Sequence, residues 1–161
     1  MPELVIDFIT SLDGYGAAEG WPGFWGLEGP EYLAWLENDP EADYTVLMGA
    51  NTYRLMSGLA SDGEPGTDAL AGLSKVVFST TLTEPLSWPN TQLVTQDPVE
   101  AVREMKDKGT TSMRTLGSLT LCRSLLKPVS WTVSAWSSSQ SSPEAAVGTG
   151  SMTGTPTSPS T

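Results

Sequence analysis

The sequence contains no histidine, and this absence removes several kinds of chemistry. Ser-His-Asp and Cys-His catalytic centres need an imidazole, and so do metal sites built on histidine. The single cysteine, Cys122, rules out an internal disulfide and a zinc site made of several cysteines. Any catalysis must therefore use carboxylates, hydroxyls, backbone groups or a bound cofactor, and we expect no metal site.

Positive charge is also scarce, with 8 Lys and Arg against 19 Asp and Glu, a net charge of −11 and a pI near 4.2. Such a chain is a poor partner for nucleic acid. The sequence has no apolar run of transmembrane length, and it opens on an apolar strand without a signal segment. We therefore expect a single domain in the cytoplasm with a small-molecule partner, and neither a nucleic acid nor a membrane.

Strands and helices alternate along the chain, and this alternation predicts an α/β sandwich with a mainly parallel central sheet. The predicted strands are Leu4–Ile9, Tyr44–Met48, Lys75–Ser79, Thr91–Val94 and Ser112–Leu116. The predicted helices are Pro30–Asn38, one from Asn51, one between Asp97 and Gly109, and one that buries Leu119, Cys122, Leu125 and Leu126. Residues 58–72, rich in Gly, Pro and acids, are expected to form a loop.

Four segments at or after strand ends carry small or polar residues, and ligands of parallel sheets bind beyond such ends. They are Ser11–Gly14, Gly49–Thr52, Ser79–Thr80 and Gly117–Ser118. Two of them are turns from a glycine into a helix, and helix N-termini attract anions. A simpler reading of Gly49 is that it allows close packing. The convergence of the four segments favours a phosphate site instead.

The loop of residues 16–29 carries the aromatic residues Trp21, Phe24 and Trp25. These side chains either cover a planar ligand or cap the core, and the sequence leaves both readings open.

Four motifs, in this order and spacing, resemble the dihydrofolate reductase-like superfamily, in particular its branch related to the bacterial riboflavin-pathway reductase domain. They are Ser11–Tyr15, Val46–Tyr53, Lys75–Leu82 with Glu84–Leu86, and Leu116–Leu121. The resemblance implies a three-layer α/β/α sandwich and a reductase that uses NADPH. Its substrate would be a small pyrimidine- or pterin-like heterocycle, as for 5-amino-6-(5-phosphoribosylamino)uracil reductase. A homodimer is a further expectation.

The resemblance also implies where the cofactor binds. Gly49, Ala50, Asn51 and Thr52 resemble the turn that holds cofactor phosphate, and Ser79 and Thr80 resemble the adenosine side. Gly117, Ser118 and Leu119 resemble the diphosphate turn, whereas Asp13 and Gly14 resemble the loop beside the nicotinamide. Asp13 is therefore the expected catalytic residue, a polar group near the reacting ring.

Two departures from the family pattern bear on specificity. The family commonly has an arginine, which pairs with the cofactor 2′-phosphate, where this chain has Ala50. Arg54 and Lys75 are the two candidates to replace it. The acid that true dihydrofolate reductases carry on the first helix is Tyr32 here, which disfavours folate reduction although Glu31 is adjacent.

The composition changes after Lys127, because residues 128–161 contain sixteen Ser or Thr and one charged residue. Such a segment is typical of a disordered linker, but its two tryptophans fit that reading poorly. Loss of one base after codon 127 offers another explanation, because the shifted frame makes codons 136–139 apolar and continues the family pattern. We therefore expect a reductase domain at 1–127, an irregular tail at 128–161 and missing final strands. The alternative function is a non-catalytic nucleotide-binding or frame-damaged remnant.

Overall fold

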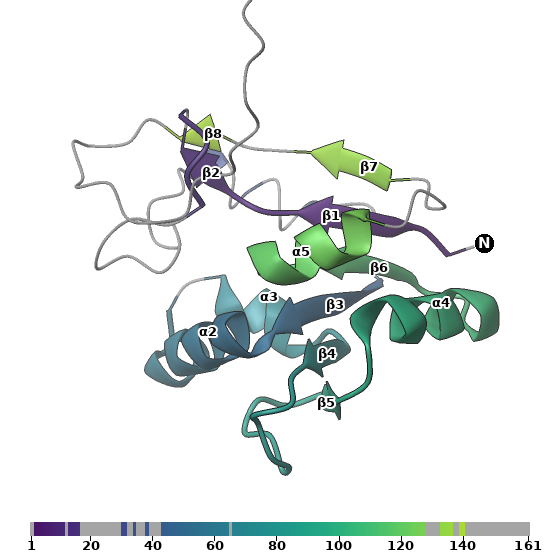
Figure 1. Ribbon diagram of the computed structural model, residues 1–161. Helices are drawn as coiled ribbons and strands as arrows, with labels where there is room; N and C mark the ends of the chain where they lie inside the picture. Colours follow the sequence, from purple (N-terminus) through teal and green to yellow (C-terminus); the bar gives the residue numbers. More distant parts are fainter. Residues whose placement is uncertain are drawn as a thin grey trace, which may run out of the picture.

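The computed structural model describes residues 2–11, 13–16, 30–31, 34, 38, 43–64, 66–127, 133–136 and 139–140, the last two ranges by their backbone. Six parallel strands form its central sheet in the order β5-β4-β3-β6-β1-β7 (Figure 1). They are β1 Leu4–Asp7, β3 Tyr44–Gly49, β4 Lys75–Phe78, β5 Thr91–Val94, β6 Ser112–Thr115 and β7 Val133–Trp136. A separate parallel pair joins β2 Thr10–Ser11 to β8 Ser139–Gln140.

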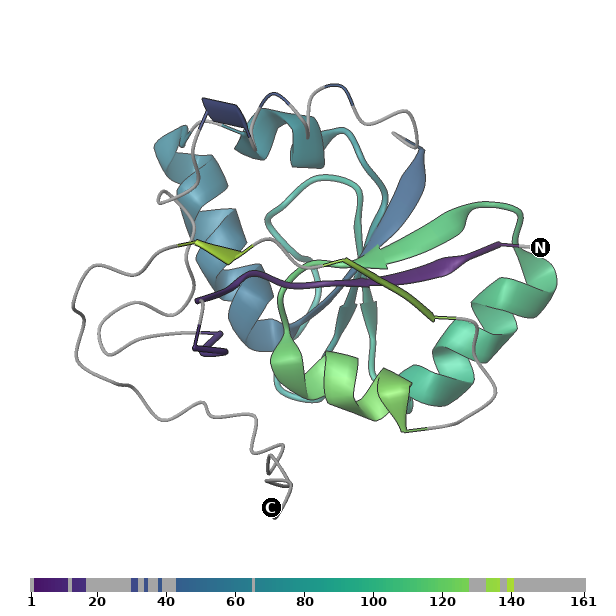
Figure 2. The same cartoon turned by 90° about the horizontal axis from the view of Figure 1, so that it is seen from above.

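Helices cover both faces of the sheet, as Figure 2 shows with the strands seen between them. The helices α2 Ala50–Asp62 and α3 Thr67–Ala71 lie on one face, and α4 Pro98–Lys108 and α5 Leu119–Leu126 lie on the other. This arrangement confirms the predicted three-layer α/β/α sandwich with a parallel sheet.

The alternation of side chains along each strand divides the core into two clusters, one on each face. On β3, Val46 and Met48 pack in the cluster that contains Tyr53 and Met56 of α2. The intervening Leu47 packs in the other cluster, whose members include residues of both helices on that face: Ala101, Val102, Leu121, Cys122 and Leu125. Cys122 is therefore the core residue that the sequence predicts.

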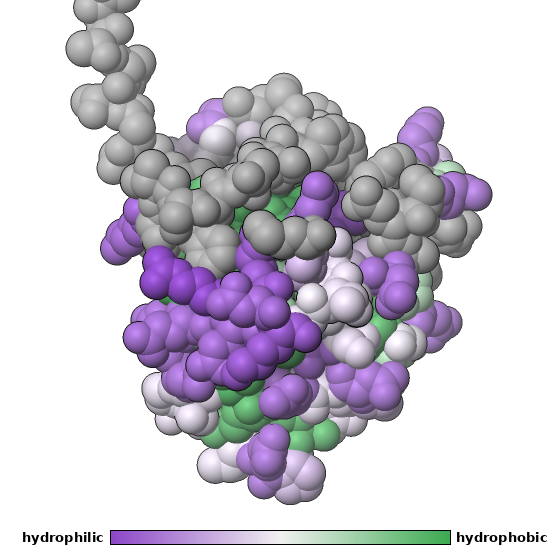
Figure 3. Space-filling model, turned by 90° about the vertical axis from the view of Figure 1, so that its right-hand side faces the viewer, coloured by the Kyte–Doolittle hydropathy of each residue, from purple (hydrophilic) through white to green (hydrophobic). Residues whose placement is uncertain are grey.

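The outer surface is more polar than these layers. The face in Figure 3 is largely hydrophilic, with small separate apolar areas. Among the described large apolar side chains, Leu126 is the exposed one, at 47%. Within the same residues, no helix is both long and apolar enough to cross a membrane.

Helix α4 begins and ends where the sequence predicts. The Asp97 side chain accepts hydrogen bonds from the N–H groups of Val99 and Glu100, which satisfies two free donors of the first turn. Pro98 occupies the first turn, and Gly109 follows the last residue of the helix.

The expected loop at residues 58–72 is wrong for most of its length. Helix α2 continues through Gly58 to Asp62, and α3 follows from Thr67. The physical reason is burial, because Leu59 and Leu70 pack against the core cluster of this face. Their packing outweighs the low helix propensity of the glycine.

The sheet also contains a strand from the segment after Lys127, where we expected an irregular chain. Strand β7 pairs in parallel with β1, from Leu4 opposite Val133 to Asp7 opposite Trp136. An edge strand of this kind needs only backbone N–H and C=O groups, which any composition except proline supplies. The expectation of irregular structure is therefore wrong for Val133–Trp136 and for Ser139–Gln140.

Other sequence predictions lie partly or wholly outside the described residues. In the predicted helix at 30–38, Pro30, Glu31 and Ala34 are helical. Trp21, Phe24 and Trp25 fall outside the described ranges, so both readings of these aromatics stay open.

Candidate functional site

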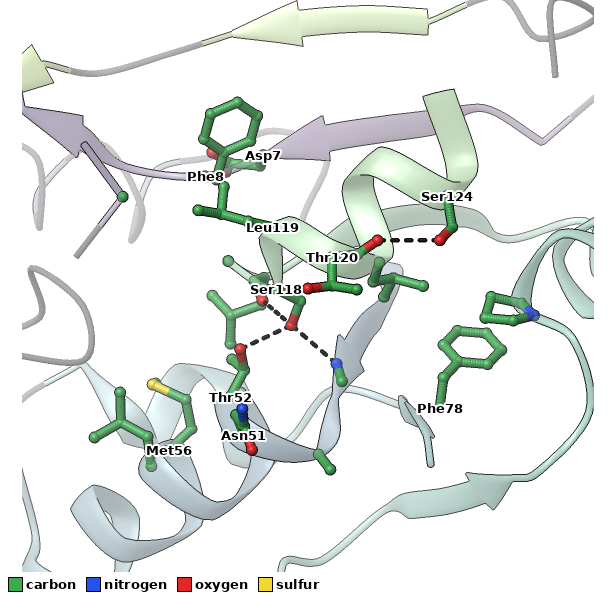
Figure 4. A pocket seen from close by; sticks show the side chains of 18 of the residues that line it. Asp7, Phe8, Asn51, Thr52, Met56, Phe78, Ser118, Leu119, Thr120 and Ser124 are labelled. Carbon is green, nitrogen blue, oxygen red and sulfur yellow. Dashed lines mark hydrogen bonds between the residues drawn. The ribbon is translucent and has the colours of Figure 1, made fainter. Parts of the chain in front are cut away.

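A cavity of about 550 Å³ opens at the carboxyl ends of the parallel strands (Figure 4). Residues 49–52 and 116–121 supply much of its wall. The first range runs from the end of β3 into α2, and the second runs from the end of β6 into α5. Two of the four predicted strand-end segments therefore meet at one cavity, as parallel topology requires.

A single hydroxyl joins these two turns. Ser118 Oγ accepts a hydrogen bond from the Gly49 N–H at 2.9 Å and donates one to Thr52 Oγ1 at 2.7 Å. Figure 4 shows this junction at the centre of the cavity. Ser118 adopts a left-handed backbone conformation with φ of 57°, directly after Gly117 at 52°. The turn therefore holds a conformation that L-residues disfavour, and its hydroxyl fixes the spacing between two helix N-termini.

Both helix N-termini at the cavity are open. Neither α2 nor α5 has a hydrogen bond from a capping side chain, and neither carries an acid in its first turn. Helix α4 differs, since Asp97 caps it and Glu100 lies in its first turn. The uncapped N–H groups and the positive dipole ends of α2 and α5 favour an anion in this cavity.

The geometry at Gly49 bears on whether this glycine serves close packing or the binding of a ligand. Its φ of −93° is accessible to any L-residue. A methyl group built on Gly49 would lie 3.8 Å from Ser118 Oγ, an ordinary contact distance. Neither the backbone conformation nor packing thus requires a glycine here. The missing side chain instead leaves room in the cavity for close approach of a ligand to the backbone.

Four predicted site residues are absent from the cavity wall. Asp13 accepts a hydrogen bond from Ser11 Oγ, and Gly14 forms a turn with φ of 88°. Ser79 Oγ accepts hydrogen bonds from the N–H groups of Thr81 and Leu82, which shapes the loop after β4. The wall contains neither these three residues nor Thr80, although Phe78, directly before Ser79, does line it. Their roles at the site stay predictions.

Gly16 and Asp7 are among the lining residues that the sequence prediction missed. Gly16 lines the cavity and lies so close to α5 that a methyl group on it would meet Leu119 Cδ1 at 2.5 Å. Asp7 lines the cavity at the end of β1. A signal existed for Asp7, because it is the one charged residue in the apolar run Leu4–Ile9.

The structure decides between the two proposed substitutes for an arginine at position 50. Lys75 is 1% exposed, and its Nζ donates to the backbone oxygens of Leu70, Ala71 and Leu73 at 2.8, 3.1 and 2.7 Å. Nζ also lies 4.7 Å from the centre of the Trp88 ring. Burial lowers the pKa of Lys75 to about 8. Lys75 is thus committed to the core, which argues against it as the substitute for the arginine.

Arg54 remains the candidate substitute. It is exposed on α2, where Nη1 donates to Asn51 Oδ1 at 3.1 Å and Nη2 donates to Thr81 Oγ1 at 3.3 Å. The guanidinium therefore spans from the first turn of α2 to the loop that Ser79 shapes.

Within the described residues, no group of three or more His, Cys, Asp or Glu side chains is arranged to hold a metal ion.

The chain is an α/β protein of the dihydrofolate reductase-like fold, and the cavity at its strand ends is the candidate ligand site. Residues 2–128 match the family described as RibD C-terminal domain, and the chain belongs to this family. A comparison with curated proteins finds no match.

Solved structures share the fold. A protein from Shewanella sp. PV-4 named for riboflavin biosynthesis is 25% identical, with a TM-score of 0.50 over 75% of this chain and 67% of that one. Schistosoma mansoni dihydrofolate reductase shares the fold at 17% identity, with a TM-score of 0.57 over 84% of this chain and 72% of that one.

A third structure is a longer protein with two named activities. The Thermotoga maritima diaminohydroxyphosphoribosylaminopyrimidine deaminase/5-amino-6-(5-phosphoribosylamino)uracil reductase is 16% identical, with a TM-score of 0.55. The match covers 91% of this chain and 47% of that protein, so it shows a common fold over about half of the larger chain.

Proposed function

We propose that this protein is an NADPH-dependent reductase of a small pyrimidine- or pterin-like heterocycle, of the aminoribosylaminouracil reductase type. The family match supports a reductase, and the cavity supports a cofactor that carries phosphate groups. The observation that carries the proposal is Gly49, which neither packing nor backbone conformation requires at the junction of two uncapped helices.

The diphosphate of the cofactor would bind across the N-termini of α2 and α5, against backbone N–H groups and the Thr52 hydroxyl. No Lys or Arg is among the described residues of the cavity wall, so these neutral donors and the helix dipoles would hold the anion. The bound cofactor supplies the hydride, and the protein contributes binding and orientation.

The two helical layers give the cavity two different sides. Phe78, Thr120 and Ser124 lie on one side of the Ser118 junction in Figure 4, and Met56 lies on the other. The ring of Phe78 and the two hydroxyls suit the adenosine part of the cofactor, next to the predicted Ser79 and Thr80. Met56, with Leu55, supplies an apolar wall for the nicotinamide and substrate rings.

The preference for NADPH would rest on Arg54. Its guanidinium already bridges Asn51 and Thr81, so it stands beside the loop assigned to adenosine. A guanidinium pairs with a phosphate through charge-assisted hydrogen bonds, and NADH lacks the 2′-phosphate that would receive them.

Titration with NADPH tests the cofactor site, with the melting temperature and tryptophan fluorescence as readouts. In the Gly49→Ala variant we expect a stability within about 1 kcal/mol of the original protein. Its NADPH affinity is expected to fall about tenfold or more, because the methyl group occupies space beside the backbone donors. The matched control is Gly58→Ala on the same helix, where a methyl group meets nothing within 4 Å. No response of the original protein to millimolar NADPH would overturn the proposal.

A non-catalytic nucleotide-binding protein is the second candidate, and the composition of residues 128–161 favours it. Cofactor binding is common to both candidates, so turnover separates them. We expect the reductase to oxidise NADPH in the presence of an aminouracil ribotide, with loss of absorbance at the nicotinamide band. Binding without turnover would support the second candidate. Asp13 as the catalytic residue, a homodimer and a cytoplasmic location stay predictions.

A further inference from the structure

The cavity has one charged side chain among its described lining residues, Asp7 at the end of β1. Phe8 and Ile9, which follow Asp7 in the same segment, also line the cavity and are apolar. Figure 4 shows Asp7 beside Phe8, on the opposite side of Leu119 from the Ser118 junction. A carboxylate beside apolar residues is costly unless it is paired.

Arg114 on the adjacent strand β6 supplies this pairing. Its Nε and Nη2 both donate to Asp7 Oδ2, at 2.9 and 2.7 Å. The two side chains are 12% and 16% exposed for Arg114 and Asp7, so solvent screens the ion pair little. The guanidinium carbon of Arg114 also lies 5.4 Å from the centre of the Tyr44 ring. The pair therefore balances the charge of the Asp7 carboxylate and holds it in place.

The backbone of Asp7 is held as firmly. Its N–H donates to Thr115 Oγ1 at 2.7 Å, and the Thr115 hydroxyl donates to its carbonyl oxygen at 3.1 Å. Both ends of the residue are thus fixed to β6. A carboxylate that is immobilised before the ligand arrives loses little conformational entropy on binding.

The cavity is consequently polarised. The N-termini of α2 and α5 make one part positive, whereas Asp7 makes another part negative. Arg114 is not among the lining residues, so the ligand meets the carboxylate rather than the guanidinium.

We propose that Asp7 recognises the substrate by accepting hydrogen bonds from ring N–H and exocyclic amino groups of an amino-substituted pyrimidine or pterin. This inference rests on the proposed function and specifies its substrate class. A ring that carries its own carboxylate would be rejected, because its anion would face Asp7.

The test uses the full chain loaded with NADPH and two probes, 2,4-diaminopyrimidine and the pyrimidine carboxylate orotate. Calorimetric titration is expected to show binding of 2,4-diaminopyrimidine at least about tenfold tighter than that of orotate. In Asp7→Asn we expect this preference to disappear while the affinity for NADPH stays within about twofold. Glu3→Gln, an exposed change just before β1, is the matched control and should retain the preference.

Asp7→Asn leaves Arg114 without its carboxylate, which is a risk to folding. The double variant Asp7→Asn with Arg114→Met removes both charges and should show the same loss of preference. Tighter binding of orotate by the original protein, or binding of neither probe, would overturn the inference. So would an unchanged preference in a folded variant. Failure of NADPH to bind in the parallel titration would instead overturn the proposed cofactor site, so the two failures are distinguishable.

Discussion

The hydroxyl of Ser118 accepts a hydrogen bond from the backbone N–H of Gly49 at 2.9 Å, across 69 residues of sequence. The contact joins the turn after β6 to the turn after β3, and with them the N-termini of α5 and α2. Ser118 also donates a hydrogen bond to Thr52 Oγ1, and its own backbone has a left-handed conformation. Stability and ligand geometry therefore depend on the same side chain.

Replacement of Ser118 separates the contribution of its hydroxyl from the cost of its left-handed backbone conformation. Ser118→Ala leaves the Gly49 N–H without its partner and keeps the disfavoured backbone conformation, so we expect a loss of about 1–3 kcal/mol in the free energy of unfolding. Ser118→Gly also loses the hydroxyl but relieves the left-handed strain, which returns about 1 kcal/mol. Urea denaturation measures both. Ser124→Ala, which removes a hydroxyl bonded to Thr120 within α5, is the control. An alanine variant as stable as the glycine variant would contradict this reading.

Arg54→Ala should change the choice of cofactor. We expect the Kd for NADPH to rise about tenfold, or about 1.4 kcal/mol, because the 2′-phosphate loses its guanidinium partner. The Kd for NADH should stay within about twofold. Fluorescence titration with each cofactor measures both constants. Arg123→Ala, an exposed arginine in the last turn of α5, is the matched control. Equal losses for both cofactors would show that Arg54 does not contact the 2′-phosphate.

Lys75 predicts an unusual pH dependence of stability. Burial lowers its pKa in the folded protein from 10.5 to about 8, whereas the unfolded chain retains the ordinary value. Between these two values the unfolded state binds more protons, so the contribution of Lys75 to the free energy of unfolding increases with pH. The increase is complete near pH 10.5 and amounts to at most about 3 kcal/mol.

Urea denaturation from pH 7 to 10.5 tests this prediction on the original protein and on Lys75→Met. The stability of the original protein minus that of the variant should rise across the window. Burial raises the pKa of the Cys122 thiol and adds an opposite trend, but this thiol is present in both proteins and cancels in the difference. Lys108→Met removes an exposed lysine and should show no such rise. Parallel stability curves for the original protein and Lys75→Met would refute the prediction.

The reading-frame hypothesis makes its own prediction. Sequencing of the gene on both strands should reveal a missing base just after codon 127. A protein with the frame restored there should melt at a higher temperature than the present chain. The restored segment would offer apolar side chains at the sheet edge, where the present tail is rich in Ser and Thr. An uninterrupted frame through codon 128 would end the hypothesis.

Several parts of the fold follow from local sequence. The strands β3, β4, β5 and β6 and the helices α4 and α5 lie where apolar periodicity and capping residues predict them. Apolar periodicity and capping residues act over a few residues, so they can be recognised in the sequence without knowledge of tertiary contacts. The same holds for the turns at Gly49 and Gly117, whose joint place at the cavity follows from parallel topology.

Other features depend on contacts between distant segments. The second half of α2 and helix α3 form because Leu59 and Leu70 reach a core that the sequence does not display. A lysine in a strand can face solvent. The Lys75 ammonium is buried instead, because the carbonyl groups of Leu70, Ala71 and Leu73 accept its hydrogen bonds.

The sequence by itself determined the layered α/β architecture and the two glycine turns, because periodicity and turn chemistry are local properties. Only the tertiary structure decided which side chains share the cavity. It placed Asp7 on its wall beside Arg114, 107 residues away in sequence, and it brought Arg54 to Thr81. Those pairings arise from strand order and helix placement, so no local pattern in the sequence could have predicted them.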